Sequence, residues 1–362
     1  MIVFVHLLND YSGSPRVLRE TIRGIVSRQD KAKLYIGSSG EGILSRCGIP
    51  VSRYFYRRSR YRLLTLFNYS FSQIILFFKL FFDRSISRNA VIYVNTLLPF
   101  GAALYGKLTG RKVIYHVHEI SITPAPLKSL LTGIARLTSS LNIYVSDAHI
   151  LALPIPGVPG KRVYNTLDTD FISRASAAKY KHNNSDCFNV LMIASLRDYK
   201  GIPELLAIAS ALLSHDEIKF QLIVNDDKAT VAKYFRDRAI PENLTVYPRT
   251  MDVTPFYAKA SLVLNLSRVD QWIETFGMTI LEALAFGIPV IAPPVGGPTE
   301  IIRDGVDGYL MSSYEVERIT QMILELSGDE AKCLALSQNA RQRSEVFGSE
   351  PFVNNIVKAI YG

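Results

Sequence analysis

Residues 261–305 constrain the fold of this chain more than any other stretch. Residues 261–266 form an apolar run with the length of a short buried strand. Apolar residues then recur at helical spacing over residues 278–286, and Gly287 and Pro289 end that pattern. A second apolar run, residues 290–292, leads into a glycine-rich turn at residues 295–300. A strand, a helix and a second strand in this order predict a parallel βαβ unit and an α/β fold.

Two carboxylates lie on either side of the start of the helix predicted for residues 278–286. Glu274 precedes the helix and Glu282 lies within it, about 10 Å further along the axis. The free N–H groups and the positive end of the dipole make that start an anion site, suited to a diphosphate. Carboxylates beside it make sense if they accept hydrogen bonds from sugar and ribose hydroxyls. The alternative is that Glu274 only interacts with the helix dipole and that Glu282 is partly solvated.

The stretch ETFGMTILEALAFGIPVIA, followed by GGPTE, resembles the signature of glycosyltransferase family 4. Most members of that family are retaining nucleotide-sugar transferases of GT-B fold. The match rests on the seven residues between the two glutamates, the FG after the first, and the G-x-P-V and G-G-x-x-E turns. The resemblance implies that Glu274 contacts hydroxyls of the donor sugar and that Glu282 contacts the ribose. It also implies that backbone amides hold the sugar and phosphate at Phe276, Gly277 and Met278.

Strand-like and helix-like stretches alternate along the 362 residues, which are enough for two domains with separate cores. The resemblance implies a GT-B protein, with two Rossmann-like domains that face each other across a cleft. We expect an acceptor-binding domain at residues 1–175 and a nucleotide-sugar-binding domain at residues 188–345. Residues 176–187 are polar and without periodicity, which is typical of a linker. Residues 346–362 are expected to form a helix that returns to the first domain.

Composition favours a folded, cytoplasmic protein. Hydrophobic residues make up 48% of the chain and charged residues 20%, which excludes a disordered chain. The first residues lack the basic segment and cleavage site of a secretory signal. Cys47, Cys187 and Cys333 are dispersed and without metal-ligand spacing, so we expect reduced thiols.

Charge is unevenly distributed along the chain. Residues 1–170 carry 22 Lys and Arg against 9 Asp and Glu, whereas the remainder carries 19 against 23. A basic half of this kind usually meets an anionic partner, such as nucleic acid, anionic lipid or a phosphorylated acceptor. Charge alone does not choose among these partners.

Residues 53–62 read RYFYRRSRYR, and an almost entirely apolar stretch follows at residues 63–82. One interpretation is a core-packed helix with a basic lead-in. The other is a surface that lies on a membrane, with arginines on anionic head groups and aromatic residues at the interface. The arginines are Arg57, Arg58, Arg60 and Arg62, and the aromatic residues are Tyr54, Phe55, Tyr56 and Tyr61. A spanning helix is disfavoured by polar residues within the stretch, and RNA binding by the lack of a recognisable module.

The first strand and helix are expected to enclose a turn that contains Gly13. An apolar run at residues 1–8 precedes a turn cluster at residues 9–15, and a helical pattern begins at residue 16. Such a loop either faces a ligand at the carboxyl end of the strand or is a plain tight turn. Members of family 4 usually have a Gly-Gly pair here, and only Gly13 is present in this chain.

His116 and His118 lie at the end of a predicted strand, residues 112–117, with Glu119 beside them. Both histidines are expected on the same face of the strand, and no third ligand is apparent, so we expect no metal site. The segment resembles the H-x-H-E segment of the family. It implies that His118 lies beside the donor sugar, where it can donate a hydrogen bond. The alternative is a structural histidine.

The loop at residues 196–201 carries two cations in front of another predicted helix. Arg197 and Lys200 are suited to clamp a diphosphate, and solvated surface charges are the alternative. The loop resembles the Arg-to-Lys–Gly loop of family 4. However, the usual arginine position is occupied by Ser195, so Lys200 is the more secure prediction.

Together these features predict a retaining, hexosyltransferase-type glycosyltransferase with Glu274, His118 and Lys200 as its catalytic residues. The expected substrates are a nucleotide-diphosphate sugar and a glycan acceptor. The acceptor is expected to be lipid-linked and to belong to the synthesis of a cell-surface polysaccharide of the O-antigen or capsule kind. No cofactor, metal or nucleic acid is expected, and the protein is expected to be peripheral at the inner face of the cytoplasmic membrane. The alternatives are a nucleotide-sugar epimerase of the same fold and a non-catalytic basic protein that binds membrane or RNA.

Overall fold

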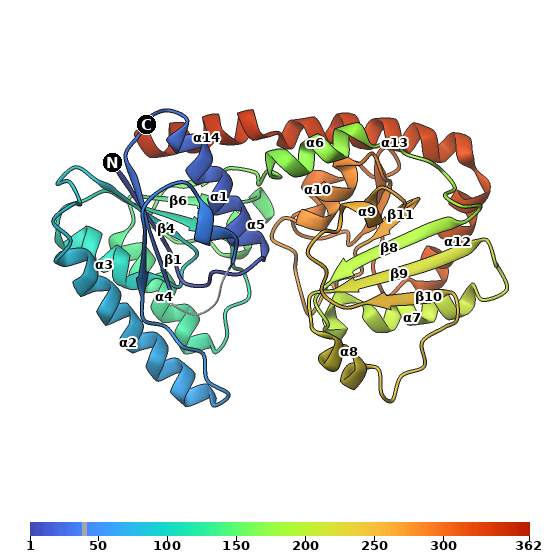
Figure 1. The fold of residues 1–362 in the computed structure, drawn as a ribbon, viewed down its shortest axis with the longest axis horizontal. Helices are drawn as coiled ribbons and strands as arrows, with labels where there is room; N and C mark the ends of the chain where they lie inside the picture. The colour runs from blue at the N-terminus through green and yellow to red at the C-terminus, as the bar shows by residue number, and fades with distance from the viewer. Residues whose placement is uncertain (38–41) are drawn as a thin grey trace. The chain divides into compact units, whose positions relative to one another are not determined.

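The chain forms two compact units, each with its own parallel sheet (Figure 1). The computed structural model describes residues 1–37 and 42–362. The first unit contains residues 1–168 and 349–362, and the second contains residues 169–348. The division therefore lies before α6 (Thr169–Ala177), which packs against α10 of the second unit, and not after residue 175. The segment expected to be a linker, residues 176–187, lies within the second unit.

The first unit is built on seven described strands in the order β3-β2-β1-β4-β5-β6-β7. The strands are β1 (Ile2–His6), β2 (Ala32–Gly37), β3 (Val51–Tyr54), β4 (Val91–Asn95), β5 (Val113–Val117), β6 (Leu141–Tyr144) and β7 (Gly160–Arg162). The helices are α1 (Gly13–Val26), α2 (Arg62–Phe81), α3 (Phe100–Leu108), α4 (Ala125–Thr138), α5 (Asp147–Ala152) and α14 (Ser349–Tyr361), with a 3-10 turn, η1, at Ile43–Arg46. The last helix, α14, packs against α1.

The second unit is built on six described strands in the order β10-β9-β8-β11-β12-β13. The strands are β8 (Phe188–Ala194), β9 (Ile218–Val224), β10 (Leu244–Tyr247), β11 (Leu262–Leu264), β12 (Val290–Ala292) and β13 (Gly308–Leu310). The other helices are α7 (Ile202–Ala211), α8 (Lys228–Tyr234), α9 (Thr254–Tyr257), α10 (Met278–Ala285), α11 (Pro298–Ile301), α12 (Val316–Gly328) and α13 (Glu330–Ser344), with 3-10 turns η2 (Asp198–Lys200) and η3 (Glu345–Phe347). The predicted α/β class is confirmed in both units.

Strand order reverses once in each sheet. In the first sheet the chain moves outward from β1 to β2 and β3, and then returns to the other side of β1 to add β4. In the second sheet the same reversal separates β8 from β11. The loops that leave two such strands run in opposite directions, so a crevice opens at their carboxyl ends, where open α/β sheets bind ligands. The residues that follow β1, β4, β8 and β11 are therefore the first place to look for a site.

Gly201 is the tightest point in the loop that follows β8. Its φ is +84°, and a Cβ at this position would lie 2.1 Å from the carbonyl oxygen of Leu266. Only glycine meets both conditions, because a side chain disfavours positive φ and would also displace the backbone after β11.

Substitution of this glycine should destabilise the second unit by more than positive φ alone explains. We expect Gly201→Ala to lower the free energy of unfolding by about 3 kcal/mol or more, because steric overlap adds to backbone strain. Gly305→Ala is the matched control, since Gly305 also has positive φ (+72°) but open space around its Cβ. It should cost about 1 kcal/mol. Urea unfolding measures both, and equal losses would show that the contact with Leu266 relaxes without cost.

Candidate active site

A largely buried ion pair joins the two loops at the strand reversal of the second sheet. Lys200 ends η2, after β8, and Glu274 lies between β11 and α10. The Lys200 ammonium donates to Oε1 of Glu274 at 2.5 Å, and both side chains are less than one-fifth exposed. Ser267 Oγ donates to the same oxygen at 2.9 Å. The structure therefore brings together two of the residues that the sequence predicted for one site.

The charge on Glu274 is held in place by its neighbours. Burial alone would raise the pKa of this carboxyl, but the Lys200 ammonium and the hydrogen bonds from Lys200 and Ser267 outweigh it. The pKa of Glu274 consequently lies below its usual value of 4.5. The carboxylate is ionised at neutral pH, and it is suited to accept hydrogen bonds from hydroxyl groups.

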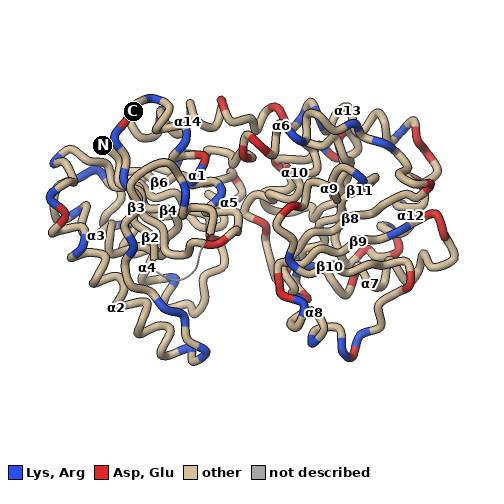
Figure 2. The backbone as a smooth tube through the Cα atoms, viewed as in Figure 1, with Lys and Arg blue, Asp and Glu red and all other residues tan. Residues whose placement is uncertain are grey.

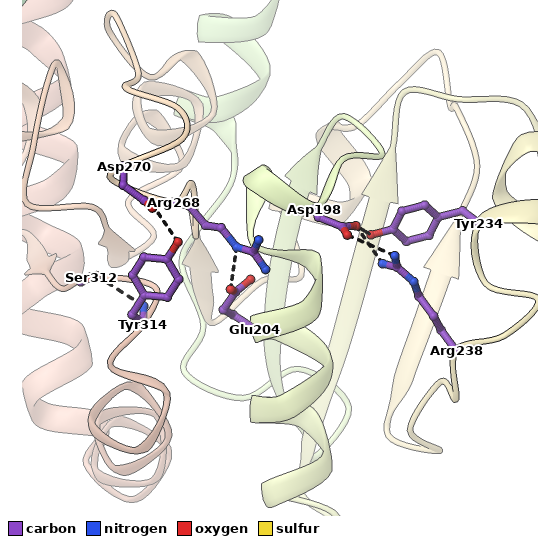
Figure 3. A network of polar contacts seen from close by, with 8 residues as sticks. All are labelled: Asp198, Glu204, Tyr234, Arg238, Arg268, Asp270, Ser312 and Tyr314. Carbon is purple, nitrogen blue, oxygen red and sulfur yellow. Dashed lines mark hydrogen bonds and ion pairs between the residues drawn. The ribbon is translucent and has the colours of Figure 1, made fainter.

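The loop that carries Lys200 is fixed from both sides by further ion pairs (Figure 3). On one side the Asp198 carboxylate accepts hydrogen bonds from both terminal nitrogens of Arg238, at 2.8 and 3.1 Å, and from the Tyr234 hydroxyl. On the other side Arg268 Nε donates to Glu204 Oε1 at 2.8 Å. Sequence reasoning did not find these residues, because their charges are 40 and 64 positions apart in the chain. These ion pairs hold the loop in place, so that only the flexible side chain of Lys200 is free to reorient.

Aromatic rings cover one side of the same lysine. Tyr199 and Trp272 stack with their ring centroids 5.1 Å apart, and Lys200 Nζ lies 4.5 Å from the Trp272 centroid. Trp272 is the only tryptophan in the chain. The ring limits water around the ammonium and strengthens its electrostatic interactions.

The segment from Glu274 to the start of α10 is held by the glycine-rich turn at residues 295–298. Gly297 N–H donates to the Glu274 carbonyl at 2.9 Å, and a Cβ on Gly297 would lie 2.3 Å from Cα of Phe276. Gly277 precedes α10 with φ of +110°. Its carbonyl accepts from Ile280 N–H, which begins the helix. The amides of Phe276, Gly277 and Met278 thus lie at a helix start fixed by backbone contacts, as an anion site requires.

Glu282 is a buried, hydrogen-bonded carboxylate and not a solvated helix residue. Only 4% of it is exposed, and the Tyr257 hydroxyl donates to Oε2 at 2.7 Å. Tyr257 in turn packs between the rings of Phe171 and Phe286. Arg197, by contrast, is exposed, and its guanidinium donates to the Leu196 carbonyl of its own loop. Of the two cations predicted to clamp a diphosphate, Lys200 thus lies in the ion pair with Glu274 and Arg197 lies on the surface, and the clamp stays a prediction.

The strand reversal of the first sheet carries a separate polar cluster centred on Asn95. Its Nδ2 donates to the Ser14 carbonyl at 3.2 Å, directly after Gly13, the first residue of α1. Asn95 Oδ1 therefore faces Nε2 of His118, 3.1 Å away. Sequence analysis did not identify Asn95 as a site residue. Its register opposite His116 in β5 explains why it reaches His118, two residues further on.

The Asn95 amide fixes the tautomer of His118. Because Oδ1 only accepts hydrogen bonds, Nε2 of His118 carries the proton. Burial holds the pKa of His118 well below its usual value, and the neighbouring His116 lowers it further. The ring is therefore neutral and Nδ1 is an acceptor at neutral pH. The expectation that the His118 ring donates a hydrogen bond to a ligand is corrected, because its one N–H is bonded to Asn95 and Nδ1 carries no proton to donate.

Three more histidines and a glutamate surround this ring. The centroids of His116 and His118 lie 4.2 Å apart, so both side chains do lie on one face. Burial lowers the pKa of His116 to about 3 and the pKa values of His6 and His149 to about 4. Burial raises the pKa of Glu119 to about 7, against hydrogen bonds that its carboxylate accepts from His118 N–H and Leu97 N–H. Within the described ranges, no group of three or more His, Cys, Asp and Glu residues is arranged to hold a metal ion.

The predicted membrane-facing residues divide between the core and the surface. Arg57, Arg58, Arg60 and Arg62 are exposed, as are Phe55 and Tyr61. Tyr54 and Tyr56 are buried, which corrects their placement at an interface. The reason is that Val51–Tyr54 is an edge strand, β3, which pairs with β2 and directs Tyr54 inward to donate to the His6 carbonyl.

Residues 175–343 match the sequence model of the family Glycosyl transferases group 1. This part of the chain is therefore similar to a group 1 glycosyltransferase domain. It is 31% identical over 190 residues to D-inositol 3-phosphate glycosyltransferase 1 of Catenulispora acidiphila, which covers 49% of this chain and 44% of that relative. It is 23% identical over 288 residues to N-acetyl-alpha-D-glucosaminyl L-malate synthase of Bacillus anthracis, with 75% of this chain and 74% of that relative covered. The chain thus spans less than half the length of the first relative and about three-quarters of the second.

Solved structures of similar fold cover the whole chain. HepE of Anabaena, solved in complex with UDP and glucose, aligns over 99% of this chain and 98% of its own, with a TM-score of 0.77 and 20% identity. OtsA, solved in its apo form, aligns over 100% of this chain and 99% of its own, with a TM-score of 0.78 and 10% identity. These likenesses confirm the GT-B fold that the sequence predicted. The ion pair of Lys200 and Glu274 lies within the residues that match the group 1 model.

The Lys200–Glu274 pair should give a distinctive pH dependence of stability. In the wild type the contribution of Glu274 is present above about pH 4.5 and is lost as the pH falls through its lowered, folded-state pKa. Lys200→Met leaves the buried carboxylate without its cation, so we expect a loss of about 3–5 kcal/mol at pH 7. Because burial then raises the pKa of Glu274, this loss should shrink as the pH falls and the carboxyl protonates.

Urea unfolding from pH 4 to pH 8 measures this dependence. The double variant Lys200→Met/Glu274→Gln should recover much of the stability at pH 7, since it removes the unpaired charge. Lys259→Met, at an exposed lysine of the same unit, is the control. A loss that is the same at every pH would contradict the electrostatic explanation and indicate a packing defect.

Proposed function

We propose that this protein is a retaining glycosyltransferase of the family 4 type that transfers a hexose from a nucleotide-diphosphate sugar to an acceptor hydroxyl. The observation that carries the proposal is the Lys200–Glu274 pair at the start of α10, within the residues that match the group 1 model. It combines a cation for the diphosphate with a carboxylate for the sugar. A structural ion pair alone does not require a helix start beside it.

The reaction divides naturally among these groups. The bond between the anomeric carbon and the phosphate oxygen breaks, and the acceptor oxygen forms a bond to the same face of that carbon. Lys200 and the amides at the start of α10 stabilise the negative charge that develops on the leaving diphosphate. The leaving phosphate oxygen takes the proton of the acceptor hydroxyl, so that no separate general base is needed. No metal ion is part of this proposal, and activity should persist in the presence of EDTA.

Two further residues orient the donor in this scheme. Glu282 is fixed by Tyr257, which suits a carboxylate that accepts hydrogen bonds from the ribose hydroxyls. His118 presents Nδ1 as an acceptor, which suits a hydroxyl of the sugar and does not suit a phosphate oxygen. Gly13 lies one residue from the carbonyl that Asn95 binds, so the same cluster positions its backbone.

The acceptor that we propose is an anionic, lipid-linked glycan at the inner face of the cytoplasmic membrane, in the synthesis of a cell-surface polysaccharide. Residues 1–170 have 13 more basic than acidic residues. Relatives are named for inositol 3-phosphate, L-malate and poly(glycerol-phosphate), all of which are anionic acceptors. HepE was solved with UDP and glucose, which makes UDP-sugars the first donors to test here.

Substitutions of Lys200 and Glu282 should affect the binding of the donor and the transfer of the sugar differently. Lys200→Ala should lower kcat by about 10²–10³-fold, because the lysine acts on charge that develops in the transition state. Glu282→Gln should mainly raise the KM for the donor, because a ribose contact is equally present before and during the reaction. Lys259→Ala is the control in the same unit.

The experiment is a thermal-shift panel of UDP, GDP, TDP and ADP sugars, followed by a product assay with the donor that binds. A stabilising shift for one base that is reduced in Lys200→Ala and Glu282→Gln supports the donor site. Conversion of the donor to its epimer without an acceptor would instead favour an epimerase. No shift with any nucleotide would contradict the transferase proposal.

A further inference from the structure

The helix α2 has apolar side chains on its exposed side as well as on its buried side. Tyr69, Ser72 and Gln73 are buried together with Leu76 and Leu80, whereas a row of further apolar side chains is exposed. This apolar row consists of Leu63, Phe67, Phe71, Ile74, Phe78 and Phe82, whose exposed fractions run from 47% (Phe71) to 84% (Leu63). The spacing of four, four, three, four and four residues keeps all six on one side of the helix, over about 28 Å.

The buried side of α2 is hydrogen-bonded to the rest of the first unit. The Tyr69 hydroxyl donates to the Leu98 carbonyl at 2.6 Å, and Gly101 N–H donates to Gln73 Oε1 at 3.2 Å. A Cβ on Gly101 would lie 2.3 Å from the Gln73 carbonyl oxygen, so the backbones of α2 and α3 are in close contact. In Figure 1, α2 lies along the outside of this unit next to α3. The helix is long and apolar enough to cross a bilayer, but crossing would break these bonds.

Basic residues lie at both ends of the apolar row. Arg57, Arg58, Arg60 and Arg62 are exposed just before it and at its first turn, and Arg84 and Arg88 are exposed after it. Figure 2 shows the α2 tube mostly in tan, with Lys and Arg gathered where the helix begins. No Asp or Glu occurs between Arg57 and Phe82. Asp83, the nearest carboxylate, is already paired with Lys33 and accepts a hydrogen bond from Tyr35.

We propose that α2 docks on an anionic lipid bilayer as an in-plane helix, with the apolar row among the upper acyl chains and the arginines on the head groups. Exposed rows of phenylalanine and leucine are unfavourable in water and favourable in the outermost part of the hydrocarbon region. Basic residues at both ends match a surface of uniform negative charge. A second copy of this chain fits less well, since either orientation of two such helices places arginines beside arginines.

This inference extends the acceptor class proposed above but stands on α2 alone. The thermal shift that a nucleotide sugar causes can therefore be measured in the same samples as membrane binding. A loss of docking with the nucleotide shift intact affects only this inference. Docking without any nucleotide shift affects only the proposed function.

Flotation of the full chain with vesicles of phosphatidylcholine, with or without phosphatidylglycerol, tests the docking surface. We expect strong binding only with the anionic lipid. Replacing Arg57, Arg58, Arg60 and Arg62 by Gln should weaken partitioning on the order of 1,000-fold, at about five- to sixfold per charge. The matched control replaces Lys179, Lys181, Lys233 and Lys259, all exposed on the second unit, by Gln. Equal binding to neutral vesicles would overturn the role of the arginines.

The apolar row is tested by Phe71→Ser/Phe78→Ser, which should weaken binding on the order of 100-fold at any salt concentration. Leu213→Ser/Leu334→Ser is the control, because those side chains are equally exposed on the second unit. Unchanged flotation of the phenylalanine variant would overturn the proposal. So would a wild type that dimerises without lipid, fails to float, and becomes monomeric on the same substitutions.

Depth separates an in-plane helix from a tilted or inserted one. In a Trp272→Phe background, a single tryptophan is placed at Phe67 or at Phe78 and quenched by lipids brominated at different positions along the acyl chain. Both positions should report the same shallow depth, about 5–10 Å below the head groups. A tilted or inserted helix would instead place the two tryptophans at different depths. A difference in depth close to the separation of the two positions along the helix axis would overturn the in-plane arrangement.

Discussion

The largely buried pair of Lys200 and Glu274 is the interaction on which the candidate site depends. Its two residues lie 74 positions apart and meet because the strand order reverses between β8 and β11. Removing two charges from water is costly, and the direct bond and the Ser267 hydroxyl offset that cost. An arriving diphosphate would compete with Glu274 for the ammonium, while Ser267 keeps the carboxylate in position. The pair thus keeps the site organised before any ligand is bound.

The same topology produces two chemically different clusters. At the reversal of the first sheet, Asn95 links the Ser14 carbonyl to a neutral His118, so these hydrogen bonds involve no charged group. At the reversal of the second sheet, the groups are charged and paired. A sugar needs directed, uncharged partners, and a diphosphate needs a cation and helix amides. The two reversals therefore differ in chemistry: one offers uncharged hydrogen-bonding groups and the other a lysine beside helix amides.

Sequence patterns were sufficient to predict an element where burial alone decides its conformation. Residues 290–292 were predicted as a strand with the bounds that the structure shows, since they form a continuous apolar run. The edge strand β3 was missed because Arg53 and Tyr54 alternate between solvent and core, and the segment was interpreted only as a basic lead-in. Asn95 and the Asp198–Arg238 pair were missed for another reason. Their roles depend on register and on long-range contacts, which no local pattern records.

The exposed apolar row of α2 illustrates the same distinction. Composition marks residues 63–82 as apolar, but only the contacts with α3 show which side of the helix is packed within the protein. The other side still carries a row of exposed apolar side chains, which is suited to an apolar medium. The charge of the chain points the same way: residues 1–170 have an excess of 13 basic residues, and the remainder has an excess of 4 acidic ones. An anionic surface would therefore attract the unit that carries α2 and weakly repel the unit that carries the Lys200 site.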